Sequence, residues 1–382
     1  MFSDRLPELH QRLDAAPQRP PDSVELKELL SAAQSETRLE PGQMWRLLHL
    51  DTESQPEAFE QLLEAGRQRR RPSLRGQVLT VSPLYATSIC QENCLYCNYR
   101  AANRGEHVAR LRLSAEELEG EARFLIHERG LRAVELVYAT DPKVRVPQIC
   151  EHIALVKSLL DEVGGGQVGL SAEPFDVEDY ARFVEAGLGF SVLWQETYDP
   201  GTYTRLHSAR HKKGRFAYRV DAFDRMLEGG LSCVGHGILS GLSPWRRDWM
   251  SLIAHGLYLR DEAGSSPAIL GTPRLKPAQG AELQTSPNLP TDPEFLLAIA
   301  IHSLALPECL PWINTRESWE LCTRAAAGGG VLFTMDCSTI PGGYAHEERG
   351  YQFPVHSFNS KLYTQRLLDQ GLQPVYDWRL TG

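Results

Sequence analysis

The sequence predicts an α/β protein, a closed (β/α)8 barrel of the TIM type preceded by an N-terminal helical extension. Two observations support this fold class. From about residue 77 onward, short β-prone segments alternate with amphipathic segments that end at or near glycine. Eight such strand-like segments are spread over roughly 300 residues, a length that fits one parallel barrel. An open, doubly wound sheet is the alternative, because alternation alone does not show that the sheet closes.

The expected strands are short and are separated by helical segments. They cover residues 77–85, 133–139, 167–173, 190–196, 233–239, 268–275, 311–315 and 330–335. The helical segments between them include 114–130, 147–164, 176–187 and 246–264. Active sites of parallel barrels lie at the carboxyl ends of the strands, so the polar residues that follow each strand are the candidates for function.

The chain divides into two parts by the same criteria. Residues 1–76 are expected to form an N-terminal helical region, and residues 77–382 are expected to form the barrel domain with a C-terminal tail. Helical spacing of apolar residues predicts three helices in the first part, within 24–34, 44–50 and 56–71. The last of them ends in the arginine run Arg67, Arg69, Arg70 and Arg71, which we expect at a solvated helix end.

Composition excludes several classes of protein. Apolar residues make up 42% of the chain, enough for a sizeable core, and the net charge of −9 argues against a broadly basic face that binds nucleic acid. The longest apolar run, 296–306, is too short to cross a bilayer, and the N-terminus shows no secretory signal. We therefore expect a cytoplasmic protein that binds neither nucleic acid nor membrane.

Three of the eight cysteines lie together, as Cys90-x3-Cys94-x2-Cys97. In a reducing compartment, clustered cysteines are more often metal ligands than disulfide partners. Three thiolates can hold an iron–sulfur cluster, whereas a structural zinc site usually has four protein ligands. Zinc and three buried reduced thiols remain the alternatives. A [4Fe–4S] cluster on three cysteines leaves one iron open for chemistry.

With Tyr96 before the third cysteine and a position after the first strand, this motif resembles that of the radical S-adenosylmethionine (SAM) superfamily. Within it, the chain is most similar to the aromatic amino-acid lyases, above all the tyrosine lyases of thiazole biosynthesis (2-iminoacetate synthases). Similar blocks follow in family order at 83–85, 194–207, 217–230, 236–259, 272–280, 314–318, 341–344 and 370–378. The resemblance extends from about Leu79 to Trp378.

The resemblance implies both cofactors and the reaction. The open iron would bind the amino and carboxylate groups of SAM, and an electron from the cluster would produce a 5′-deoxyadenosyl radical. The implied reaction is Cα–Cβ cleavage of an aromatic amino acid, with tyrosine giving 2-iminoacetate and p-cresol for thiazole (thiamine) biosynthesis. A low-potential flavodoxin or ferredoxin and a thiazole synthase are the implied protein partners. The alternatives are a diverged lyase acting on tryptophan or another amino acid, and a cluster-binding accessory protein that does not cleave SAM.

Four residues are candidates for the substrate side of the site. Arg316 follows the seventh strand, and an arginine can grip a carboxylate with two parallel hydrogen bonds. The resemblance makes it the clamp on the amino-acid group, and an ion pair with Glu317 is the structural alternative. The resemblance also places Tyr85 beside the substrate and aligns Thr334 with a serine position. His207 could shuttle a proton, although a lone histidine is more often structural.

Further residues are candidates for the cofactor side. Acidic and polar side chains at strand ends can accept hydrogen bonds from ribose hydroxyls, which predicts such a role for Ser171, Glu173 and Glu196. Arg274 could pair with the carboxylate of SAM or with Glu196. The resemblance assigns the backbone of Tyr96 to the adenine.

The chain departs from the family after its second strand. Related enzymes usually carry there a turn with glycine and glutamate that binds the SAM amino group, whereas residues 137–142 are Val-Tyr-Ala-Thr-Asp-Pro. Thr140 and Asp141 are the replacement candidates, and Tyr138 is bulky enough to narrow the site. No cysteine follows Cys337, so we expect amino-acid cleavage without assembly of iron carbonyl species on a second cluster. His236, inside the fifth strand, is expected to line the core.

Overall fold

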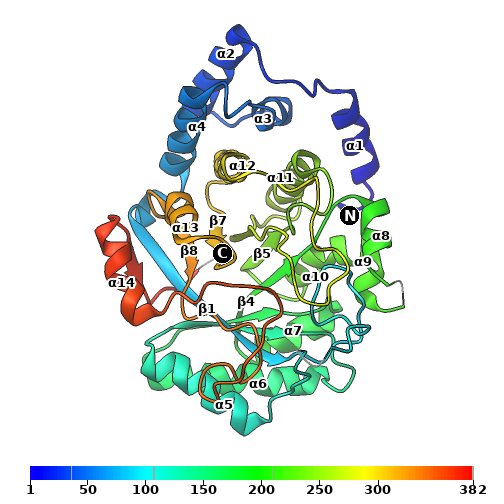
Figure 1. Ribbon diagram of the computed structural model, residues 1–382, viewed down its shortest axis with the longest axis vertical. Coiled ribbons are helices and arrows are strands. Elements are labelled where there is room, and N and C mark those ends of the chain that lie inside the picture. The colour runs from blue at the N-terminus through cyan, green and yellow to red at the C-terminus, as the bar shows by residue number, and fades with distance from the viewer. Residues whose placement is uncertain (36, 106–107, 209, 381–382) are drawn as a thin grey trace.

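A computed structural model of the chain describes residues 1–35, 37–105, 108–208 and 210–380. Its centre is a parallel barrel (Figure 1) in which β1 pairs with both β2 and β8. This double pairing closes the ring, so the fold is a (β/α)8 barrel and not an open sheet. The barrel strands are β1 (Gln77–Thr87), β2 (Ala133–Tyr138), β3 (Gln167–Ser171), β4 (Leu188–Trp194), β5 (Val234–Gly237), β6 (Ile269–Gly271), β7 (Leu310–Ile313) and β8 (Val331–Thr334).

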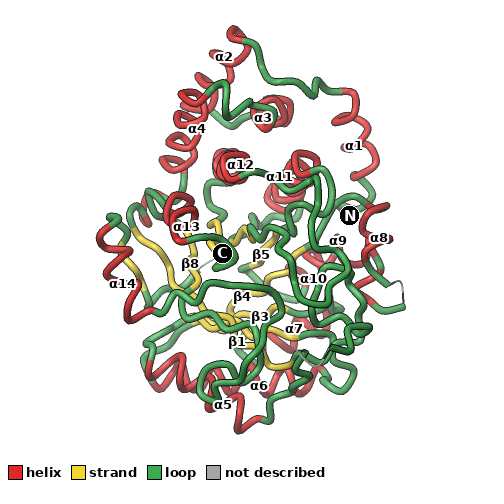
Figure 2. The backbone as a smooth tube through the Cα atoms, viewed as in Figure 1, coloured by secondary structure: helices red, strands yellow, loops and turns green. Residues whose placement is uncertain are grey.

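Helices surround the barrel (Figure 2), and each helical segment predicted between the strands contains one. They are α5 (Ala115–Arg123), α6 (Val146–Glu162), α7 (Val177–Glu185), α8 (Pro200–Leu206), α9 (Phe216–Val220), α10 (Ala222–Glu228), α11 (Trp245–Asp261), α12 (Asp292–Ala305), α13 (Trp319–Ala326) and α14 (Ser360–Asp369). Capping boxes begin α5 at Ser114 and α12 at Thr291. Among the described residues, no helix combines the length and the apolar character needed to cross a membrane.

The C-terminal tail closes the amino-terminal end of the barrel. A ninth strand in the described chain, β9 (Gln373–Val375), pairs in parallel with the first residues of β1. Trp378 then packs into the cluster of inward-facing residues that includes Leu79 and Phe190. Its indole Nε1 donates a hydrogen bond to the carbonyl oxygen of Thr80 at 2.7 Å. The tail therefore leaves the carboxyl ends of the strands as the open end of the barrel.

Four helices precede the barrel in the described part of the chain, where the sequence predicted three. They are α1 (Leu6–Ala15), α2 (Ser23–Gln34), α3 (Pro41–Leu48) and α4 (Pro56–Arg69). Helix α1 was missed in the sequence because a polar residue, His10, occupies one of its buried positions and interrupts the apolar spacing. Helices α1, α3 and α4 lie against α11 and α12 (Figure 1), α2 packs on α4, and all four share one hydrophobic cluster with α11 and α12. A domain boundary at residue 76 stays a prediction.

The arginine run that follows α4 is not the solvated helix end that the sequence predicted. Arg70 is buried and donates hydrogen bonds to the hydroxyl of Ser303 and to the carbonyl oxygen of Ala325. Arg71 donates from Nε to the carbonyl oxygen of Glu308 at 2.9 Å. These guanidinium groups satisfy buried acceptors near the ends of α12 and α13, which a sequence pattern does not reveal.

His236 occupies the core position that the sequence predicted. Its side chain is fully buried, and its Nε2 lies 3.0 Å from Nε2 of His302 on α12. The two rings pack between β5 and the helices, away from the open end of the barrel.

Candidate active site

A cavity of about 220 Å³ lies at the carboxyl ends of the barrel strands. Its wall combines the loop after β1 with the ends of several other strands and with residues that follow β8. Of the site residues predicted from the sequence, those that line it are Tyr85, Cys90, Cys94, Tyr96, Cys97, Thr140, Ser171, Glu173, Glu196, Arg316 and Thr334. His207, Asp141 and Arg274 lie outside this lining.

The loop after β1 brings the three clustered cysteines to one wall of the cavity. The amide of Cys97 donates a hydrogen bond to the carbonyl oxygen of Cys94 at 3.1 Å. The amide of Gln91 donates to the carbonyl oxygen of Thr140 at 2.9 Å. Burial and the neighbouring thiols raise the pKa of Cys90 to about 11, and burial raises that of Cys94 to about 12. A bound metal is therefore needed to stabilise the thiolates. Three soft sulfur donors beside an open cavity fit an iron–sulfur cluster.

Arg316, after β7, is a half-buried cation with an unusual environment. Its guanidinium carbon lies 3.4 Å from the centre of the Phe353 ring, and Nη1 donates to the carbonyl oxygen of Arg274 at 3.4 Å. No carboxylate among the described residues pairs with it, because Glu317 pairs with Arg274 and Lys276. Burial lowers the pKa of Arg316, which means that its surroundings disfavour the charged guanidinium. An anionic ligand in the cavity would stabilise this charge. Its remaining donors are suited to a carboxylate.

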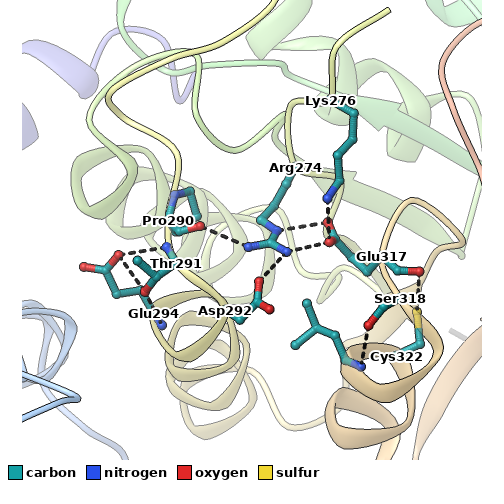
Figure 3. Close-up of polar contacts among 10 residues, drawn as sticks. Arg274, Lys276, Pro290, Thr291, Asp292, Glu294, Glu317, Ser318 and Cys322 are labelled. Carbon is teal, nitrogen blue, oxygen red and sulfur yellow. Dashed lines mark hydrogen bonds and ion pairs between the residues drawn. The ribbon is translucent and has the colours of Figure 1, made fainter.

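Arg274 occupies a structural network instead (Figure 3). Its Nε donates to Oε1 of Glu317 at 2.9 Å, Nη1 donates to the carbonyl oxygen of Pro290 at 3.0 Å, and Nη2 pairs with Asp292 at 2.7 Å. The predicted pairing with Glu196 is wrong, because the donors of Arg274 turn toward α12 and the start of α13. The same contacts argue against the predicted role at the SAM carboxylate.

Glu196 lies just after β4 and lines the cavity with a strained backbone, at φ 72°. Its Oε1 accepts a hydrogen bond from Nζ of Lys213 at 2.9 Å and lies 3.8 Å from Nη2 of Arg219. Burial disfavours the carboxylate, but Lys213 and Arg219 outweigh it, and the pKa of Glu196 falls to about 2. Glu196 is therefore an ionised hydrogen-bond acceptor at neutral pH.

Glu92 and Glu173 add two carboxylates to the same cavity. Glu92 lies between the first two cysteines and is 1% exposed, and neither of its carboxylate oxygens has a partner among the described residues. Burial raises the pKa of both glutamates. Sequence reasoning missed Glu92 and Lys213, although the place of Glu92 inside the cysteine motif was an available signal.

His207 supports Tyr96 and does not face the cavity. Its Nε2 lies 2.7 Å from the hydroxyl of Tyr96, and its Nδ1 lies 2.9 Å from the carbonyl oxygen of Tyr203. Burial and the nearby Lys213 lower the pKa of His207 to about 3. Because both ring nitrogens are engaged and the ring stays neutral, this geometry argues against the predicted proton shuttle.

The divergent turn after β2 is only partly available to a cofactor. Asp141 accepts hydrogen bonds from Arg112 at 2.7 Å and from the hydroxyl of Thr87 at 2.9 Å, which argues against its predicted role at SAM. Thr140 reaches the cavity. The Tyr138 ring turns outward, and its hydroxyl lies 2.8 Å from Nδ1 of His152 on α6. Tyr138 is nevertheless among the residues that line the cavity, so the predicted narrowing of the site stays a prediction.

Aromatic side chains line the cavity beside the remaining candidates. Trp194 and Trp312 lie edge to face, with ring centres 6.0 Å apart. The hydroxyl of Thr334 accepts from Nε1 of Trp312 at 2.8 Å, and the hydroxyl of Tyr85 donates to Oε1 of Gln352 at 2.8 Å. The tryptophans were not singled out because aromatic residues in a strand pattern are assigned to the core by default.

The comparisons with known proteins agree with this site. Residues 84–252 match the family model of the Radical SAM superfamily. The chain is 28% identical over 355 residues to 2-iminoacetate synthase of Escherichia coli (strain K12), with 91% of each chain covered. It is 27% identical over 266 residues to 3-methylornithine synthase of Methanosarcina acetivorans, covering 69% of each chain. The structure of the FeFe-hydrogenase maturase HydG from Carboxydothermus hydrogenoformans matches with a TM-score of 0.85 and 25% identity, over 99% of this chain and 85% of that chain.

Residues 84–252 form a Radical SAM domain. Its cofactors are accordingly a [4Fe–4S] cluster and SAM, and the cysteine wall of the cavity suits the cluster. Its similarity to the 2-iminoacetate synthases extends over 91% of the chain. As a radical SAM enzyme it acts on a small molecule and draws its electron from a reductant.

Proposed function

We propose that this radical SAM lyase cleaves the Cα–Cβ bond of tyrosine, giving 2-iminoacetate and p-cresol, and that 2-iminoacetate is used for thiazole formation in thiamine biosynthesis. The observation that carries the proposal is Arg316, a half-buried guanidinium that shares one cavity with the three cysteines and has no carboxylate partner among the described residues. The similarity to 2-iminoacetate synthase over 91% of both chains supports the choice of substrate.

At the cofactor end, Cys90, Cys94 and Cys97 would hold the cluster. The acceptors around SAM would be Glu196, Glu173, Ser171 and Thr140, with the backbone of Tyr96 at the adenine. When bound, the cluster and SAM supply a 5′-deoxyadenosyl radical that removes a hydrogen atom from the substrate amine. The protein residues hold the ionised and polar groups of the cofactor by hydrogen bonds, and His207 keeps Tyr96 in place.

At the substrate end, Arg316 would bind the amino-acid carboxylate through two parallel hydrogen bonds. Tyr85 and Thr334 also line the cavity on this side, and Trp312 offers an apolar surface for an aromatic ring. Phe353 stacks on Arg316 and covers it from solvent. The main task of these residues is to place the substrate amine against the radical carbon, which is a problem of position and orientation.

Two protein partners belong to the proposal. A low-potential flavodoxin or ferredoxin would deliver the electron, since radical SAM chemistry requires a reductant. A thiazole synthase would consume 2-iminoacetate, which is a reactive imine and hydrolyses in water.

The test is an anaerobic assay of the reconstituted enzyme with SAM, a chemical reductant and either tyrosine or tryptophan. We expect 5′-deoxyadenosine and p-cresol in equal amounts with tyrosine. Cleavage of tryptophan in place of tyrosine would show a diverged lyase. The altered turn after β2 favours the other candidate, a cluster-binding accessory protein. No 5′-deoxyadenosine with either amino acid would show a cluster-binding accessory protein.

A further inference from the structure

Glu135, the third residue of β2, is a buried carboxyl group to which the sequence analysis gave no role. It is 5% exposed and lines the cavity. Its carboxyl group forms no hydrogen bond or ion pair with any of the described residues, and burial alone acts on its pKa. A carboxyl group inside a protein without a partner is costly, so its place on a cavity wall requires an explanation.

Strand geometry sets where this carboxyl group lies. Side chains alternate along β2, so Val134 and Leu136 pack outward among the helices, whereas Ala133, Glu135 and Val137 face the barrel interior. Ala133 belongs to the apolar cluster at the closed end, and Val137 lies beside the cysteine loop. Glu135 therefore lies between the closed end of the barrel and the cluster site, at the inner end of the cavity.

The carboxyl group has the protonation state of a hydrogen-bond donor. Burial raises the pKa of Glu135 to about 8, so it is mainly the neutral acid near pH 7. A neutral carboxylic acid offers one O–H donor and a carbonyl acceptor. A hydroxyl group, which both donates and accepts, is the matching partner.

Arg316 and Glu135 share the cavity without pairing with each other, since no ion pair within 4.0 Å joins them. Both line this one cavity together with Tyr85 and Cys337. A ligand between them would meet an anion-binding group at one end and a hydroxyl-binding group at the other. An amino acid with a phenol side chain has these two groups at its two ends.

We propose that Glu135 is a specificity-determining residue that binds the phenol hydroxyl of the substrate. The inference rests on the proposed lyase function, because it takes the amino-acid carboxylate to Arg316. Phenylalanine would fill the same space but leave the buried carboxyl group without a partner. A site built to bind a hydroxyl rejects the analogue that lacks it far more strongly than an apolar pocket separates two similar side chains.

The test measures binding before turnover. Anaerobic, cluster-reconstituted enzyme is loaded with SAM but left unreduced, and the dissociation constants of L-tyrosine and L-phenylalanine are measured by calorimetry. We expect the wild-type protein to prefer tyrosine by at least about 100-fold. Glu135→Leu should lower this preference at least about tenfold, mainly by weakening tyrosine binding, whereas Glu135→Gln, which keeps a donor and an acceptor, should retain most of it.

The matched control is Glu173→Gln, which removes a carboxylate from the cofactor side of the same cavity. It should weaken SAM binding and leave the ratio of tyrosine to phenylalanine affinity unchanged. Equal affinity of the wild-type protein for the two amino acids would overturn the role of Glu135, and so would an unchanged ratio in Glu135→Leu. Equal affinities of the wild-type protein would overturn the role of Glu135 even if one variant fails to fold.

Reduction of the same samples separates this inference from the lyase proposal. If the wild-type protein prefers tyrosine through Glu135 but releases no p-cresol, the lyase proposal fails and the binding role of Glu135 stands. If p-cresol forms and the ratio does not depend on Glu135, the lyase proposal stands and the role of Glu135 is overturned.

Discussion

At the scale of single residues, the partners of a charged side chain separate structural groups from candidate ligand-binding groups. Arg274 and Arg316 both follow barrel strands, yet only Arg274 is paired with carboxylates among the described residues. Glu196 is likewise paired with Lys213, whereas Glu92 is buried without a partner in the described chain. Because a buried charge without a partner is costly, such residues mark places where a ligand would complete the site.

Replacing Arg316 with lysine should uncouple the two halves of the reaction. Lysine keeps the charge but loses the planar pair of donors. Each charge-assisted hydrogen bond contributes about 1.5–3 kcal/mol, so amino-acid cleavage should fall at least about tenfold. SAM binding and iron content should persist, and some 5′-deoxyadenosine should form without cleaved amino acid. The exposed Arg324, changed to lysine, is the control. Loss of SAM binding with normal substrate affinity would assign Arg316 to the cofactor.

The cysteine ligands can be tested by iron content after anaerobic reconstitution. Cys90→Ala, Cys94→Ala and Cys97→Ala should each lose the roughly four irons that one [4Fe–4S] cluster contains. Alanine at Cys150, Cys233, Cys309, Cys322 or Cys337 should leave the iron content unchanged. An iron-free Cys309→Ala variant beside an iron-loaded Cys94→Ala variant would refute the assignment.

Glu196 should make the stability of the cluster-free protein depend on acidic pH. Its pKa falls from the ordinary value of 4.5 to about 2 in the folded state, because the attraction of Lys213 and Arg219 exceeds the effect of burial. This contribution is complete above about pH 4.5 and is lost as the pH falls toward about 2. In urea unfolding between pH 7 and pH 3, the stability advantage of wild type over Glu196→Gln should shrink below about pH 4.5. A constant difference across this range would contradict the assigned ion pair.

At the scale of elements, the N-terminal helices are held against the barrel helices by a close helix crossing. A Cβ atom on Gly66 of α4 would lie 2.9 Å from the Cα and carbonyl oxygen of Ala300 on α12. Only glycine fits such an approach without displacement of one helix. The long apolar helix α12 is therefore buried on both sides, between α4 and the barrel (Figure 1).

Gly66→Val should push α4 away from α12. Overpacking of this kind costs about 1–3 kcal/mol, which should appear as a lower midpoint of urea unfolding. Gly42→Ala is the matched control, since a Cβ at that position on α3 meets nothing within 4 Å. It should be neutral or slightly stabilising because alanine favours a helix over glycine. Equal midpoints for Gly66→Val and wild type would refute the close contact.

At the scale of the whole molecule, the barrel is closed at one end by residues about 300 positions away from its first strand. Trp378 is buried against Phe190 and is hydrogen-bonded to β1. Because this end is closed, ligands can bind at the carboxyl end of the barrel, where the cavity lies. The cysteine loop and the residues after β8 then share one wall of that cavity.

Trp378→Ala should destabilise the molecule as a whole. Truncation of a buried tryptophan costs about 3–5 kcal/mol, and the lost indole hydrogen bond leaves the carbonyl oxygen of Thr80 without this donor. The thermal midpoint should fall, and cluster retention should fall with it. Leu362→Ala on α14, where the side chain is 70% exposed, should change stability by no more than about 0.5 kcal/mol.

The sequence alone predicted the alternation of strands and helices, the cysteine motif and eleven of the residues that line the cavity. These features are local: alternation of strands and helices, a short spacing of three cysteines, and polar residues directly after strands. Closure of the barrel places all strand ends at one opening, so residues such as Arg316 and Glu173 meet whatever their distance in the chain. This is why the sequence pattern alone predicted that these residues lie at the same end of the barrel.

Only the tertiary structure decided which candidates are free to bind a ligand. Arg274, Asp141 and His207 have suitable side chains, but Glu317, Arg112 and Tyr96 engage them. Glu135 follows no recognised pattern and becomes a candidate only because packing leaves it buried, without a hydrogen-bond partner among the described residues and on the cavity wall. The physical reason is that pairing and burial depend on residues brought together from distant segments of the chain. The order of residues in the sequence does not show which of them become partners.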